Sequence, residues 1–195
     1  MNTKNIVNFI FELSQLKRQK HTGWWLAGVN NPVSVAEHML RAAQIGYILA
    51  VMEGNNNPEK IASMLIIHDN CESRTGDQNK ISAKYYDKKD CEAKVFSNQI
   101  KNLGARIEKK WKNYFDEFEE RNTKEGVIAK DADWLEVAFQ AKEYVDIGHA
   151  SAQDWIDNVE KALETKSAKI LLKEMKKTKF TDWWDGLKEM TYKKL

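Results

Sequence analysis

The chain has 195 residues, of which 42% are hydrophobic and 31% are charged, and its net charge is +2. This length suffices for one domain with a full hydrophobic core, and the composition is ordinary for a soluble globular protein. The sequence contains no run of 18 apolar residues, so no membrane span is predicted. A secretory signal is not expected either, because residues 1–10 lack a basic stretch followed by an apolar one. Cys71 and Cys91 form no CxxC pair, which favours free thiols in a cytoplasmic protein.

Helical periodicity begins near the N-terminus, where apolar residues from Ile6 to Leu16 follow i, i+3, i+4, i+7 spacing. Residues 21–32 contain glycine and are predicted to form a loop. Ser34 fits an N-cap, and Glu37 three residues later completes a capping box at the start of the next helix. Residues 54–58, Gly-Asn-Asn-Asn-Pro, are the clearest break in the chain. The helices expected in chain order are 6–16, 34–52, 59–69, 88–103, 105–121, 124–147, 151–163, 167–177 and a short one over 180–192. No long stretch of alternating β-branched residues occurs, so the predicted fold class is all-α, a single helical bundle.

Two of the four histidines stand beside carboxylates in expected helices. Glu37-His38 lies early in the second helix, and His68-Asp69 ends the apolar run 64–67. Burying imidazole and carboxylate groups is costly unless they are paired or ligate a metal. Together, these groups suit a divalent ion such as Mn, Co, Zn or Fe. A His-Asp dipeptide alone is common by chance, so His68 by itself is equally well explained as a satisfied core or surface histidine.

Four short elements occur in order along the chain. They are His-Thr-Gly-Trp at 21–24, Ser-Val-Ala-Glu-His-Met at 34–39, His-Asp-Asn-Cys-Glu with a following Gly-Asp over 68–77, and Lys-Asp-Ala-Asp-Trp-Leu-Glu at 130–136. They resemble the RTGW, SVAEHM, HDxxE…GD and KxxDxxE elements of the HD-domain 5′-deoxynucleotidase family. The resemblance covers roughly residues 10–147 and implies an all-α HD domain that hydrolyses phosphate esters with metal-activated water. Nothing in the sequence resembles a glycine-rich phosphate loop, which argues against a kinase or a P-loop NTPase.

The resemblance implies one divalent metal ion, Mn, Co, Zn or Fe, with Mg also possible. The ligands that it implies are His38, His68, Asp69 and Asp133. Asp131 is the rival for the last ligand. Aligning the following Gln140-Ala141 with the family's LQA places the ligand at Asp133, and Asp131 would then face elsewhere, because residues two apart on a helix do not share a face.

Two further acids match the family pattern. Glu72 lies three residues after Asp69, close enough to reach a metal-bound water, and is the candidate general base or proton shuttle. Asp77 would orient that water or support the ligands. The alternative for both is an exposed acid in a polar loop.

Candidate substrate contacts are Arg18, His21, Trp24 and Lys84. The family usually has arginine where His21 stands, so this chain departs from the pattern at an expected phosphate contact, and Arg18 could substitute. Each single cation is also explained as a solvent-facing charge. Trp24 is expected to pack against the sugar or the base. No role is assigned to His149 or Trp155.

The predicted HD-type phosphohydrolase domain spans residues 1–165, and residues 166–195 form a basic, tryptophan-containing helical extension of it. The extension has nine lysines and four acids. A solvated helix face explains this charge better than nucleic-acid binding does, so nucleic acid is not an expected partner. The leading function is a 5′-nucleotidase acting on (deoxy)nucleoside 5′-monophosphates. The alternatives are a deoxynucleoside triphosphohydrolase or another small-molecule phosphohydrolase on the same site, and a metal-binding scaffold protein. The resemblance also implies a homodimer.

Overall fold

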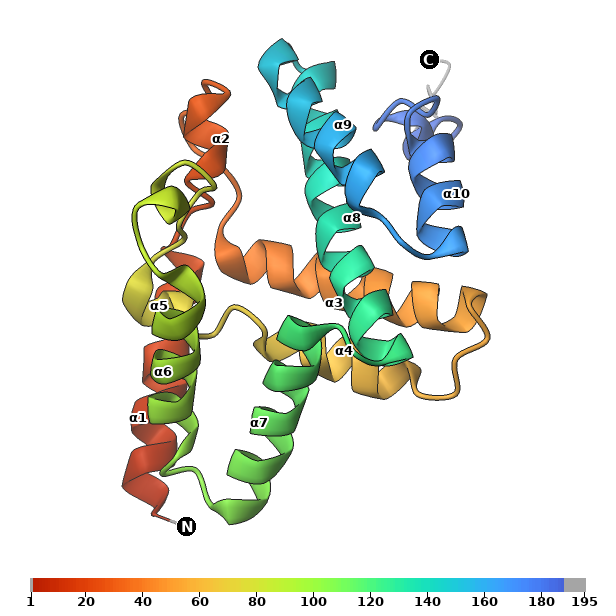
Figure 1. Cartoon of the computed structure of the whole chain (residues 1–195). Coiled ribbons are helices and arrows are strands. Elements are labelled where there is room, and N and C mark those ends of the chain that lie inside the picture. The colour runs from red at the N-terminus through yellow and green to blue at the C-terminus, as the bar shows by residue number, and fades with distance from the viewer. Residues whose placement is uncertain (1, 188–195) are drawn as a thin grey trace, which may run out of the picture.

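Across residues 2–187, which the computed structural model describes, the chain is built of helices joined by loops (Figure 1). The only strand-like pairing in that range is an isolated antiparallel bridge between Lys20 and Ser34. The α-helices are α1 (Thr3–Leu13), α2 (Gly23–Leu26), α3 (Val35–Met52), α4 (Pro58–Ile67), α5 (Glu72–Thr75), α6 (Lys88–Ile100), α7 (Ala105–Glu120), α8 (Lys124–Asp146), α9 (Gln153–Ala162) and α10 (Lys166–Met175). Short 3₁₀ turns are η1 (Ser14–Lys17), η2 (Ser82–Lys84), η3 (Ala150–Ala152) and η4 (Asp182–Trp184). The predicted all-α class is confirmed.

Helices α3, α4 and α8 pack against one another at the centre of the molecule (Figure 1). Gly46 of α3 permits a close approach, because a Cβ at this position would lie 2.2 Å from Leu65 Cδ1 of α4. Helices α9 and α10 pack on α8 and complete the main core. Buried members of this core from five helices are Leu49, Leu65, Leu135, Ile156 and Leu172.

A second core cluster lies among α1, α6 and α7, where the rings of Phe96 and Phe115 stack at 4.4 Å. Ile67 belongs to this cluster, whereas Leu65, two residues earlier, belongs to the main core. The chain therefore passes from one core to the other at the end of α4. Cys71 is buried in the second cluster, where burial raises the pKa of its thiol and keeps it protonated.

Local sequence explains where the two central helices begin. Ser34 accepts a hydrogen bond from the Glu37 backbone N–H, and the Glu37 carboxylate accepts from the Ser34 backbone N–H, so the expected capping box is present at α3. Pro58 occupies the first turn of α4, where its missing N–H is harmless. Helix α4 ends at Ile67, two residues before the predicted end, so Asp69 lies in the following turn. The loop expected at 21–32 contains the four-residue helix α2.

Helix α10, at the start of the predicted C-terminal extension, packs on the main core. Leu172 and Met175 of α10 are buried in that core. Of the short helix predicted over 180–192, the described part contains the 3₁₀ turn η4, and the remainder lies outside the described residues. Among residues 2–187, no helix combines the length and the apolar character needed to cross a bilayer.

Candidate metal centre

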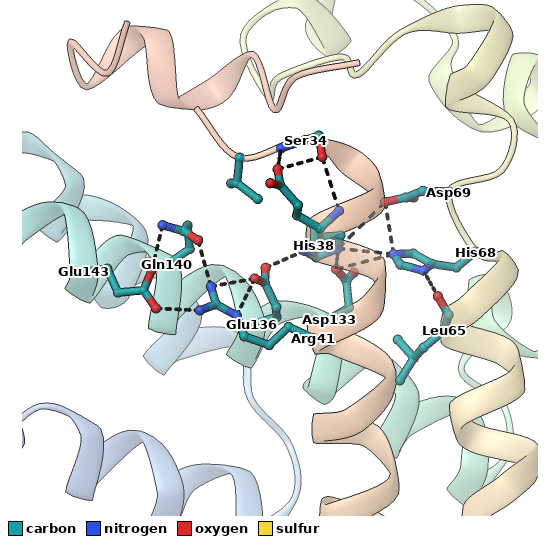
Figure 2. A network of polar contacts seen from close by, with 12 residues as sticks. Ser34, His38, Arg41, Leu65, His68, Asp69, Asp133, Glu136, Gln140 and Glu143 are labelled. Carbon is teal, nitrogen blue, oxygen red and sulfur yellow. Dashed lines mark hydrogen bonds and ion pairs between the residues drawn. The ribbon is translucent and has the colours of Figure 1, made fainter. Parts of the chain in front are cut away.

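Four side chains from three parts of the fold meet at the junction of α3, α4 and α8 (Figure 2). His38 comes from α3, His68 and Asp69 follow α4, and Asp133 comes from α8. The two imidazole Nε2 atoms lie 3.4 Å apart. His68 Nε2 lies 3.0 Å from Asp69 Oδ2, and His38 Nε2 lies 3.2 Å from Asp133 Oδ1. Two nitrogens and two carboxylate oxygens thus surround one point, which is the arrangement that a borderline divalent cation requires.

The outer nitrogen of each imidazole is occupied by a protein acceptor. His68 Nδ1 donates to the Leu65 carbonyl oxygen at 2.8 Å, and His38 Nδ1 is hydrogen-bonded to the Glu136 carboxylate. With the proton on Nδ1, the lone pair of Nε2 is directed at the cluster. This tautomer is the one that metal-ligating histidines adopt, so the donor set fits a divalent metal ion.

Glu136 is itself fixed by a polar row along α8 (Figure 2). Arg41 of α3 donates from Nε to Glu136 Oε1 at 2.9 Å and from Nη2 to Gln140 Oε1 at 2.8 Å, and it pairs with Glu143. Glu136, Gln140 and Glu143 are spaced i, i+4, i+7, so they face α3 together. Glu136 was not among the predicted site residues, although it is the final residue of the KxxDxxE element and is recognisable as part of that motif.

The electrostatics of the cluster match a site for a cation. Burial opposes protonation of His68, but the adjacent Asp69 and Asp133 carboxylates outweigh it and raise the pKa of His68 to about 10. Burial also opposes protonation of His38, but the nearby carboxylates, chiefly Glu136, outweigh it and raise the pKa of His38 well above its ordinary value. Burial also opposes ionisation of Asp133, yet the Lys130 ammonium, 2.9 Å from its Oδ2, and the two histidines lower its pKa. The site therefore attracts positive charge, whether as protons or as a metal ion.

Asp131 and Asp133 occupy different environments, as the two-residue spacing predicted. The Asp131 carboxylate accepts hydrogen bonds from the Glu164 N–H at 3.0 Å, the Thr165 N–H at 2.6 Å and the Thr165 hydroxyl at 2.7 Å. It anchors the connection between α9 and α10 to α8. Only Asp133 is directed at the histidines.

The carboxylate of Glu72 is buried beside this cluster, which is unusual for a charged group. Its Oε2 has no hydrogen-bond partner among the described residues, and its Oε1 lies 3.8 Å from Lys88 Nζ. Burial, together with the neighbouring Asp69 and Asp77 charges, raises the pKa of Glu72 well above its ordinary value. A carboxylate with a raised pKa and a free oxygen is suited to accepting a proton near neutral pH.

Asp77 connects two loops. Its Oδ2 accepts hydrogen bonds from the Thr22 N–H at 2.5 Å and the Thr22 hydroxyl at 2.9 Å. It thereby holds the segment that contains His21 and Trp24 against the segment after α5.

A cavity of about 450 Å³ opens from the metal cluster. Its walls include the predicted site residues His21, Trp24, His38, Asp69, Glu72, Asp77 and Asp133. Trp155, to which the sequence analysis gave no role, also lines it and packs against Trp24 with ring centroids 5.1 Å apart. A hollow of about 540 Å³ near residues 53–57 and 121–125 contains none of the predicted site residues. The cavity of about 450 Å³ is therefore the one that adjoins the candidate metal centre.

The cations nearest the cluster differ from the predicted ones. Arg18 is hydrogen-bonded to Ser14 on the surface, and neither it nor Lys84 of η2 lines the cavity. Lys80 lines it instead, as does Lys88, the first residue of α6. Its role could not be inferred from the sequence, because the residues around it form an ordinary run of surface charges.

Comparisons with known proteins identify the family of this chain. A model of the HD domain family matches residues 13–176. The 5′-deoxynucleotidase HDDC2 of Dictyostelium discoideum is 34% identical over 151 residues, which are 72% of this chain and 77% of that protein. The human 5′-deoxynucleotidase HDDC2 is 27% identical over 160 residues, 80% of this chain and 76% of its own. A solved structure, a conserved hypothetical protein from Pyrococcus furiosus, superposes with a TM-score of 0.73 at 29% identity and covers 88% of this chain and 99% of its own. The chain belongs to the HD domain family.

Proposed function

We propose that the protein is a metal-dependent 5′-nucleotidase that hydrolyses deoxynucleoside 5′-monophosphates to nucleoside and phosphate. The observation that carries this proposal is that the His38, His68, Asp69 and Asp133 cluster opens directly into a cavity with aromatic walls. The names of the Dictyostelium and human relatives support the substrate class. The two-histidine, two-aspartate set supports Mn, Co, Zn or Fe as the ion, in preference to Mg.

A divalent ion held by these residues would supply Lewis-acid chemistry, making water nucleophilic at neutral pH and offsetting charge on the phosphoryl oxygens. Glu72 would take the proton of the attacking water on its unpartnered Oε2. Lys88 would offset negative charge beside Glu72 and the bound phosphate. Asp77 would position the wall of the cavity through Thr22.

The nucleoside would occupy the part of the cavity between Trp24 and Trp155. Trp24 is buried against Tyr144 as well, with ring centroids 5.1 Å apart, so its face is rigidly placed. Rigid aromatic walls discriminate by shape, which supports a role in recognising the sugar or the base.

Phosphate release from ribo- and deoxyribonucleoside 5′-mono- and triphosphates tests the proposal, with metal removed by chelation and then Mn, Co, Zn, Fe or Mg added back. We expect metal-restored release of phosphate from the monophosphates. Asp69→Ala and Glu72→Gln should abolish it, whereas the surface variant Lys84→Met should retain it. Release of tripolyphosphate would instead favour the triphosphohydrolase alternative. Metal binding without hydrolysis would favour the scaffold alternative.

The homodimer implied by the family resemblance also remains a proposal, and an apolar stripe on α3 supports it. Leu40, Tyr47, Ile48 and Val51 follow i, i+7, i+8, i+11 spacing on one face, and Ile48 and Val51 are 52% and 59% exposed. An apolar face of this kind on a soluble protein typically marks an interface. Light scattering should give twice the monomer mass for the native protein and the monomer mass for the double variant Ile48→Lys, Val51→Lys. A monomeric native protein would contradict the proposal.

A further inference from the structure

His21 is held firmly at the edge of the metal cluster. Its backbone N–H donates to the Val33 carbonyl oxygen at 3.1 Å, beside the bridge between Lys20 and Ser34. The next residue, Thr22, is tied to Asp77 through both its N–H and its hydroxyl. The direction of the His21 side chain is therefore set by structure on both sides of it.

The His21 imidazole points into the cluster. Its ring lies against that of His38, with centroids 4.6 Å apart. Its Nε2 is buried and has no hydrogen-bond partner among the described residues, although such a nitrogen normally finds one. His21, His38 and Asp69 each offer one ligand atom, and these three atoms lie within 4.8 Å of one another. His38, His68 and Asp133 form a second triad that meets the same criterion.

We propose that His21 is a fifth protein ligand of the metal ion. His38 is a member of both triads, and Nε2 is its available nitrogen, since its Nδ1 is engaged by Glu136. An ion bound to His38 therefore lies beside His21 and Asp69 as well as His68 and Asp133. This inference rests on the metal centre of the proposed function.

Three imidazoles and two carboxylates have consequences for the ion. Added nitrogen donors favour borderline transition metals over Mg, which prefers oxygen ligands. His21 stands where the family usually has arginine, so the phosphate would take its cationic contacts from the cavity lysines Lys80 and Lys88.

Binding of Co²⁺ to the metal-free protein tests the proposal by chelator competition and by the visible d–d absorption of the bound ion. The variant His21→Phe removes the nitrogens and retains a ring, and His21→Ala serves if the phenylalanine disturbs the fold. His149→Phe is the matched control, because His149 follows α8 and does not line the cavity. We expect the His21 variants to lose at least about tenfold in Co²⁺ affinity and to shift the absorption band, and the control to change neither.

The outcomes separate this inference from the proposed function. If the native protein binds no Co²⁺, the metal centre itself is wrong. If the native protein and the folded His21 variants bind Co²⁺ with the same affinity and the same spectrum, His21 is not a ligand, and the metal centre stands without it.

Discussion

At the scale of single residues, the site depends on groups that never touch the ion. Glu136 accepts the Nδ1 proton of His38 and so fixes the tautomer that directs Nε2 at the cluster. Glu136→Gln removes the charge and offers an amide that can turn its N–H₂ towards His38. We expect a loss of about 10- to 100-fold in metal affinity, the usual effect of removing such a partner. Chelator competition measures it, with Glu143→Gln as the control because Glu143 contacts Arg41 but not His38.

Equal metal affinities in these two variants would mean that Glu136 serves only to position Arg41.

Lys88 should set the pH at which the enzyme becomes active. Glu72 must be ionised to act as a base, so the rate rises with pH through its pKa. Burial and the Asp69 and Asp77 charges raise that pKa, and Lys88 is the neighbouring group that lowers it. In Lys88→Met the pKa of Glu72 rises further, and the acidic limb of log kcat/KM against pH moves to higher pH. Lys84→Met, outside the cavity, should leave the limb in place. An unmoved limb in Lys88→Met would exclude Glu72 as the titrating base.

These residues also show the limit of prediction from sequence. The order of motifs pointed to His38, His68, Asp69 and Asp133, and the structure places these side chains within hydrogen-bond distance of one another in pairs. Lys88 and Trp155 reach the same cavity from α6 and α9, which lie outside the motif elements. Their proximity is a product of helix packing. The residues next to Lys88 and Trp155 in the sequence do not indicate that these side chains line the same cavity.

At the scale of helices, α8 uses its two aspartates for opposite purposes. Asp131 binds the backbone between α9 and α10, and Asp133 faces the metal cluster. Asp131→Ala removes the acceptor of two partly buried backbone N–H groups, which costs about 0.5–1.5 kcal/mol for each hydrogen bond lost. We expect a lower free energy of unfolding in urea with unchanged metal affinity. We expect the opposite pattern for Asp133→Ala: metal binding is lost, and the free energy of unfolding without metal changes less than in Asp131→Ala. If Asp131→Ala abolishes metal binding in the folded protein, the assignment of the ligand is wrong.

The junction of α7 and α8 should tolerate no side chain at Gly126. Replacing glycine by alanine inside a helix normally stabilises it by about 1 kcal/mol. Here an added Cβ would lie 2.4 Å from the Glu117 carbonyl oxygen, a backbone atom that cannot rotate away. We therefore expect Gly126→Ala to destabilise the protein by about 1–3 kcal/mol, the usual range for overpacking. The exposed neighbour Lys124→Ala is the control in the same turn, and a stabilised Gly126→Ala would contradict the close approach.

Most helices were predictable because their signals are local. The capping box at Ser34 and the break at 54–58 lie within a few residues of the ends that they define. The short helices α2 and α5 were not predicted, since four residues are too few for apolar periodicity. Helix α4 ends two residues before its predicted end, at Ile67. The turn that follows directs Asp69 at the histidines, and this contact between distant parts of the chain is not visible in the local sequence.

At the scale of the whole molecule, the metal cluster lies where the main core meets the second cluster, since α4 passes from the one to the other immediately before His68. An ion that binds α3, α4 and α8 together stabilises the folded state and has no preformed site in the unfolded chain. Free metal at 100 times its dissociation constant would add about 2.7 kcal/mol, which in a chain of this size raises Tm by roughly 5–10 °C.

Chelation should therefore lower the Tm of the native protein by this amount in a single transition, because α4, one of the helices that share the ion, contributes to both the main core and the second cluster. Asp133→Asn is the matched variant. It retains the shape of the ligand but removes its charge, so its Tm should respond weakly to chelator or to added Mn²⁺. If chelation leaves the native Tm unchanged, the cluster does not hold an ion in the folded protein. If chelation splits the transition in two, the cores unfold separately, and the ion is what couples them.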